Sequence, residues 1–166
     1  MPEKSLRKTV AIRIRRERLS TPRTIVTSGF RLRPDKATGL IDVFLEVTGS
    51  KGERVIFDPV LLRSNLDVLK RYAAGLTVEP DERAEKEEVS VTESATYANL
   101  AHFSHMGNRA ETILGVFCLS DWVEATRQDK PVEIKSTDVL VLISTTAFQK
   151  KLLQHLVLTI NQQVAE

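Results

Sequence analysis

The stretch RLRPDKATGLIDVFLEV, residues 31–47, places turn-forming residues between two apolar segments, and a related stretch, SHMGNRAETILGVFCLS, follows at residues 104–120. Residues 30–44 align without a gap on residues 103–117, with four identities in fifteen positions. Pro, Asp, Asn and Gly between two strand-like segments are typical of a β-hairpin. The sequence therefore predicts two similar β-hairpins, one in each half of the chain.

The order of the surrounding segments extends the repeat. Each hairpin follows an alternating strand, and each is followed by an apolar strand and then by a helix with one apolar stripe. In the first half these elements are residues 9–14, 54–57 and 59–74, and in the second half they are residues 88–91, 138–143 and 145–162. Each half thus reads as four strands and one helix.

We expect an α+β fold built by tandem duplication of a four-stranded antiparallel sheet followed by one helix, with pseudo-twofold symmetry. The first unit spans residues 8–76, an acidic linker spans residues 77–87, and the second unit spans residues 88–163. The two units form either one continuous sheet of about eight strands, with both helices on one side, or two sheets packed together.

Composition restricts the class of protein. The chain has 166 residues, is 42% hydrophobic and only 5% aromatic, and is therefore expected to be globular rather than disordered. No apolar run approaches the roughly 20 residues that span a bilayer, and no apolar segment follows the charged N-terminus. A cytoplasmic protein that does not enter a membrane is expected. The single cysteine, Cys118, lies in an apolar run and is expected to be buried.

The formal net charge of +2 conceals a basic N-terminal region. Residues 1–33 contain ten Lys or Arg and two Glu, whereas residues 79–93 contain seven acids and two bases. Arginines grouped on one surface would neutralise phosphates, which makes a nucleic-acid interface one interpretation. A solvated or internally paired surface is the other. The candidate arginines are Arg13, Arg15, Arg16, Arg18, Arg31 and Arg33.

Candidate sites are few. His102 and His105 are three residues apart on a predicted strand, so they point to opposite faces and do not form a metal site. No nucleophile with a base, no phosphate-binding glycine loop and no zinc-type cysteine spacing is found, so neither catalytic residues nor a cofactor is predicted. Phe44 and Phe117 fall on the outward face of their hairpins, and Trp122 falls in a predicted loop, residues 121–135. We interpret these three aromatic residues as partner-binding.

The second half also carries a family resemblance. VSVTESATYANLAHFSHMGNRAETILGVF, followed after a gap by VLVLISTTAFQKKLLQHLVLTINQQ, resembles a family of short bacterial proteins known only as a domain of unknown function. The resemblance covers residues 88–163 and rests mainly on YANLAHFSH. It implies a bacterial origin and a small sheet-and-helix fold, and it implies no reaction. The order of four strands and a helix is also similar to that of the export chaperone SecB, whose subunits bind unfolded chains.

The leading hypothesis is a non-enzymatic protein-binding or assembly module of a bacterial cytoplasmic complex, which presents sheet edges and aromatic residues to a protein partner or to a second copy of itself. A homo-oligomer is therefore expected. The alternatives are a nucleic-acid-associated protein that uses the arginine cluster and a SecB-like chaperone that binds unfolded chains. An unrecognised hydrolase has little support.

Overall fold

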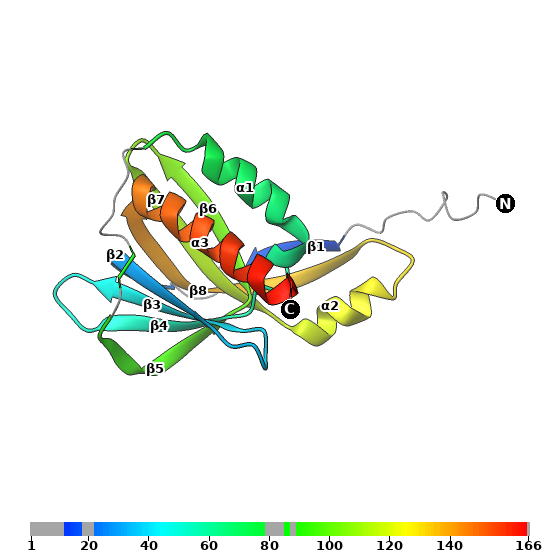
Figure 1. Cartoon of the computed structure of the whole chain (residues 1–166). Helices are drawn as coiled ribbons and strands as arrows, with labels where there is room; N and C mark the ends of the chain where they lie inside the picture. Colours follow the sequence, from blue (N-terminus) through cyan, green and yellow to red (C-terminus); the bar gives the residue numbers. More distant parts are fainter. Residues whose placement is uncertain (1–11, 18–21, 79–84, 87–88, 166) are drawn as a thin grey trace.

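The structure is a computed structural model that describes residues 12–17, 22–78, 85–86 and 89–165. It has an α+β fold, with a mixed eight-stranded sheet and three helices among these residues (Figure 1). The strands are β1 (Ile12–Glu17), β2 (Arg23–Pro34), β3 (Ile41–Val47), β4 (Gly52–Phe57), β5 (Val91–Ala98), β6 (Leu100–Met106), β7 (Arg109–Phe117) and β8 (Val132–Thr145). The helices are α1 (Leu66–Gly75), preceded by the short 3-10 helix η2 (Leu62–Asn65), α2 (Leu119–Thr126) and α3 (Thr146–Ala165).

The strand order is β5-β4-β3-β2-β8-β7-β6, and β1 pairs with β8 beside the start of β2. Within each half, three strands form an antiparallel meander, β2-β3-β4 and β6-β7-β8. The first strand of each half instead pairs in parallel with the last strand of the other half, β1 with β8 and β5 with β4. The prediction of two antiparallel four-stranded sheets is therefore wrong, because these two strands cross between the halves and make one mixed sheet.

Each of the two hairpin turns contains a glycine in a left-handed backbone conformation. Gly39 and Gly107 adopt positive φ angles of 77° and 61°, which a residue with a side chain disfavours. In the first turn, the Asp35 carboxylate accepts the amide N–H of Ala37 at 2.9 Å. In the second turn, the Thr146 hydroxyl donates to the Gly107 carbonyl at 2.8 Å, which attaches the start of α3 to the hairpin.

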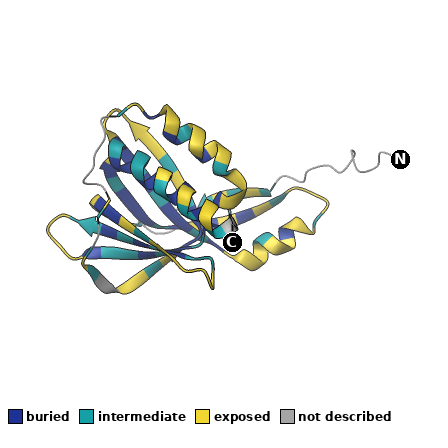
Figure 2. Ribbon diagram, viewed as in Figure 1, coloured by how far each residue is buried: buried dark blue, intermediate teal, exposed yellow. Residues whose placement is uncertain are grey.

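Helices α1 and α3 cover one face of the sheet, which we call the helix face, and they pack against each other. The main core lies on this side, where buried residues line the strands beneath α3 (Figure 2). Phe30, which is fully buried, contacts the edge of Phe148 with ring centroids 5.6 Å apart. No helix among the described residues is long and apolar enough to cross a bilayer.

A second, smaller core lies around α2, on the opposite or outer face of the sheet. Phe117, Ile134 and Ala125 are buried there, and Trp122 packs against them. The predicted loop at residues 121–135 is thus wrong, because this segment contains most of α2 and the beginning of β8. Helix α2 covers part of the outer face at the end where β1 pairs with β8.

Candidate functional site

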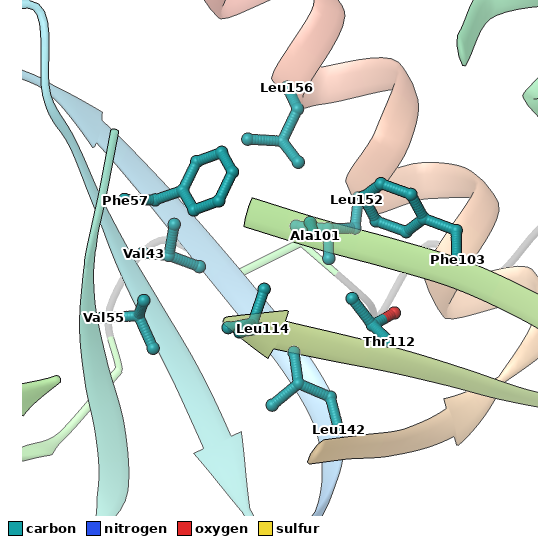
Figure 3. Close-up of a pocket in the computed structure, with 10 residues that line it drawn as sticks. All are labelled: Val43, Val55, Phe57, Ala101, Phe103, Thr112, Leu114, Leu142, Leu152 and Leu156. Atoms are coloured by element: carbon teal, nitrogen blue, oxygen red, sulfur yellow. The ribbon is translucent and has the colours of Figure 1, made fainter. Parts of the chain in front are cut away.

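An apolar slot lies beneath α3, between the β2-β3-β4 meander and the β6-β7-β8 meander (Figure 3). Val43, Val55 and Phe57 enter it from β3 and β4, and side chains of β6, β7 and β8 close the opposite side. Leu152 and Leu156 of α3 form the roof in this view. The full lining is Val43, Val55, Phe57, Ala101, Phe103, Thr112, Leu114, Leu142, Leu152 and Leu156.

The slot is narrow and has almost no polar character. The space between its atoms is about 340 Å³ including the mouth, and only a small part of it is wide enough for a water molecule. Thr112 is the one polar side chain in the lining, and its hydroxyl oxygen accepts a hydrogen bond from Gln149 at 3.3 Å. Because apolar walls offer water no partners, a group that enters the slot is expected to be apolar.

Gln149 organises the polar contacts beside the slot. It is fully buried on α3, and its Nε2 lies 3.2 Å from the carbonyl oxygens of Ser104 and Glu111 as well as 3.3 Å from Thr112 Oγ1. These acceptors require the amide nitrogen on that side, so Oε1 faces Tyr72 and accepts its hydroxyl proton at 2.9 Å. The side chain therefore ties α3 to β6, β7 and α1.

The direction of this chain of hydrogen bonds also fixes the tautomer of His105. The Tyr72 hydroxyl has one proton and gives it to Gln149, so the Tyr72 oxygen must accept from His105 Nδ1, which lies 2.9 Å away. His105 consequently carries a proton on Nδ1 in its neutral form. Desolvation at this position raises the pKa of Tyr72, which keeps the phenol protonated and able to donate.

Tyr72→Phe is expected to lower the free energy of unfolding by about 2 kcal/mol, because it leaves the buried Gln149 Oε1 without a donor. Urea unfolding followed by circular dichroism measures the change. His105→Ala is the matched comparison, because it removes only the exposed end of the same chain of bonds and is expected to cost less. Equal stability of the wild type and Tyr72→Phe would contradict this account of Gln149.

A charged cluster lies on the outer face. Arg16 of β1 donates two hydrogen bonds to Asp138 of β8, from Nε to Oδ1 at 3.0 Å and from Nη2 to Oδ2 at 2.6 Å. The hydrogen bonds that Arg16 donates to Asp138 raise the pKa of Arg16 above its usual value. Desolvation, and secondarily the charge of Arg16, lowers the pKa of His102, so the neutral imidazole is favoured there. The cluster is therefore a structural ion pair with a neighbouring neutral histidine.

Of the three predicted partner-binding aromatic residues, the structure brings Phe117 and Trp122 together and places Phe44 on a different hairpin. Phe117 is 3% exposed and its ring centroid lies 5.9 Å from that of Trp122, so both residues pack within this chain. Phe44 is half-buried on the outer face, where Arg31 and Arg54 are its cross-strand neighbours. Helix α2 of the same chain covers Phe117. Phe44 is left as the more accessible of the two hairpin phenylalanines.

The candidate arginines do not form one surface. Alternation along β1 places Arg13 and Arg15 on the side opposite Arg16, and Arg15 lies 3.5 Å from Glu133. Arg31 and Arg33 are exposed on the outer face near the far end of β2. Arg18 lies outside the described residues. The described members are thus divided between two faces, and one of them, Arg16, is held by Asp138.

The cysteine and two of the histidines were also considered as possible sites in the sequence. Cys118 is exposed, so its predicted burial is wrong: β7 ends at Phe117 and the thiol lies just before α2. A hydrogen bond with the Ser120 hydroxyl lowers the pKa of Cys118. Hydrogen bonds from the backbone amides of Asp121 and Ser120 lower it further. His102 and His105 point to opposite faces, as expected. Across residues 12–17, 22–78, 85–86 and 89–165, no three His, Cys, Asp or Glu side chains gather as a metal site requires.

Sequence reasoning missed the slot and Gln149. Each slot residue has the pattern of an ordinary core position, and only the spatial arrangement of β3, β4 and β6 leaves space between them. Gln149 did give a signal, because an amide directly after Phe148 interrupts the apolar side of the helix. A polar residue at such a position usually marks a buried hydrogen-bond network.

Comparison of the chain with protein-family models, curated proteins and solved structures finds no match in any of the three.

Proposed function

We propose that the protein is a non-enzymatic protein-binding or assembly module, and that the apolar slot receives one apolar side chain of a partner. The observation that carries this proposal is the slot itself, which is lined by nine apolar side chains and by Thr112, whose oxygen is already hydrogen-bonded. Apolar anchors that enter desolvated pockets supply most of the binding energy of many protein interfaces. This function preserves the leading interpretation of the sequence but moves the site away from Phe117.

The chemistry of the slot favours an anchored side chain over a free small molecule. Sites for metabolites combine apolar walls with a few convergent polar groups that set the orientation of the ligand. The slot lining offers a single polar group rather than several that converge, and the oxygen of that group, the Thr112 hydroxyl, already accepts from Gln149. A side chain needs no such group, since the backbone of its own protein orients it from outside the slot.

A peptide titration tests this function. The probe is a fluorescein-labelled peptide of nine residues, built from Ser and Thr around a central Leu, and its control carries Ser at the centre. Burying one Leu side chain contributes about 1.5 to 3 kcal/mol, which is roughly a tenfold to hundredfold gain in affinity. Fluorescence anisotropy is expected to detect binding of the Leu peptide and much weaker binding of the Ser peptide.

The variant Ala101→Leu fills the slot from β6 and is expected to weaken binding of the Leu peptide at least tenfold. Its control is Ala37→Leu, which adds the same side chain to the exposed β2–β3 turn, outside the slot lining. Circular dichroism checks that both variants stay folded. Binding of the Leu and Ser peptides with equal affinity, or undiminished binding to Ala101→Leu, would count against the slot as the binding site.

The two alternatives are separated in the same assay. A SecB-like chaperone would hold long unfolded chains better than the short peptide, which reduced and carboxymethylated lactalbumin can reveal by competition. A nucleic-acid-associated protein would retain labelled single-stranded DNA at low salt and release it as salt is added. The division of the described arginines between two faces gives the nucleic-acid alternative less support than the protein-binding one.

We also propose that the two halves descend from a tandem duplication. Support comes from the gapless hairpin alignment and from the matching order of three meander strands and a helix in each half. Helix α2 is then an insertion between the third and fourth strands of the second half, where the first half has only a short turn. A bacterial, cytoplasmic origin and a homo-oligomeric state remain predictions of the same proposal.

A further inference from the structure

The strand pairings make the two halves depend on each other in a reciprocal way. β1 belongs to the first half but extends β8 of the second half, with six residues in parallel register from Ile12 opposite Val132 to Glu17 opposite Thr137. β5 belongs to the second half but extends β4 of the first half, again in parallel. Each meander therefore receives its additional strand from the other half.

Apolar contacts follow the same exchange. Ile12 and Ile14 of β1 pack against the second core, whose buried members Leu100, Phe117, Ala125 and Ile134 all belong to the second half. Conversely, Ala98 at the end of β5 is fully buried in the main core, which it shares with Val43, Val55 and Phe57 of the first half. Separating the halves would expose both sets of side chains to water, which is unfavourable in proportion to the apolar area involved.

Polar contacts join the halves at the same two places. The Asp138 side chain is 9% exposed, and its bidentate partner Arg16 comes from the other half. Glu17, the next residue of β1, pairs with Lys135 of β8 at 3.3 Å. Where β5 pairs with β4, the backbone N–H of Asp58 donates to the Ala98 carbonyl at 2.8 Å. Without β1, Asp138 would be a largely buried carboxylate that lacks its guanidinium.

We infer that the two halves are obligate binding partners, joined in the manner of a twofold dimer whose subunits exchange their first strands. The packing of α1 against α3 adds a third contact of the same kind, because these helices are the matching elements of the two halves. The first part of β8 thus pairs with a parallel strand that carries two apolar residues and one arginine. Strand β1 provides these as Ile12, Ile14 and Arg16. A continuous chain between the halves is then not needed for their recognition.

Co-expression of the chain as two pieces tests this inference. Residues 1–80 carry an affinity tag, residues 81–166 carry none, and the cut lies outside the described residues. We expect the untagged piece to co-purify in a 1:1 complex whose circular dichroism spectrum matches that of the intact chain. Recovery of either piece as a folded monomer without the other, or failure to recover any complex, would overturn the inference.

Two variants locate the interface. Ile14→Asp in the tagged piece places a charge in the second core and is expected to lower the captured amount of the other piece at least tenfold. Val68→Asp, a change at a position of α1 that is 56% exposed, is expected to leave capture unchanged. In the intact chain, urea unfolding is expected to show one transition. Two separate transitions there would contradict the mutual dependence even if the pieces co-purify.

Discussion

Phe117→Asp is expected to unfold the protein. The Phe117 residue is 3% exposed. The side-chain amide of Asn99 binds its backbone, accepting from Phe117 N at 3.0 Å and donating to the Phe117 carbonyl at 2.9 Å. Loss of the ring alone costs about 3 to 5 kcal/mol, and a carboxylate buried without a partner adds several more. This sum is comparable with the whole stability of a domain, about 5 to 15 kcal/mol. Circular dichroism and a thermal melt measure the outcome.

The control is the same substitution at the matching phenylalanine of the other hairpin. Phe44 is half-buried, and an aspartate at this position would lie between the cross-strand residues Arg31 and Arg54. Cross-strand ion pairs are favourable by a few tenths of a kcal/mol, so Phe44→Asp is expected to stay folded. A cooperative melt of Phe117→Asp close to that of Phe44→Asp would show that α2 does not hold Phe117 in a core.

Gly52→Ala is expected to lower the free energy of unfolding by about 3 kcal/mol. A Cβ at this position would lie 2.2 Å from the Leu45 carbonyl oxygen and 2.9 Å from that of Ser90, so backbone rather than a flexible side chain would have to move. Such overpacking typically costs about 1 to 3 kcal/mol, and backbone clashes fall at the upper end. The change also disturbs the hydrogen bond from Gly52 N to Ser90 O, at 2.8 Å.

Gly75→Ala is the matched control for this prediction. Gly75 is the last residue of α1, and no atom lies within 4 Å of an added Cβ. Because Ala favours helix more than Gly by up to about 1 kcal/mol, this variant is expected to be as stable as the wild type or more stable. Urea unfolding of both variants measures the difference. Equal midpoints for Gly52→Ala and Gly75→Ala would contradict the close approach of β4 to Leu45 and Ser90.

Local patterns in the sequence predicted both hairpins and two of the helices, α1 and α3. Turn residues around Gly39 and Gly107 indicated both hairpins, and the apolar spacing around Leu69 and Leu153 indicated α1 and α3. These features depend on neighbours a few residues apart, and so they can be read from one sequence. The α+β class followed from them.

Long-range pairing could not be read in the same way. A strand such as β1 has the same alternation whether it pairs with its own half or with β8, because alternation reports which side is buried and not which strand lies alongside. Helix α2 was missed because it has no counterpart in the first half, so comparison of the two halves assigned its residues to a loop. The slot depends on how far the strands diverge, a property of the assembled sheet alone.

The parallel pairing of β1 with β8 also bears on how the protein is made. Arg16 and Asp138 are 122 positions apart, so the first strand finds its place only when most of the chain has left the ribosome. Until then Ile12 and Ile14 have no core to enter, and the nascent chain carries them uncovered. Contacts of such sequence separation slow folding, so synthesis rate and chaperone capture of the nascent N-terminus should govern the yield of native protein.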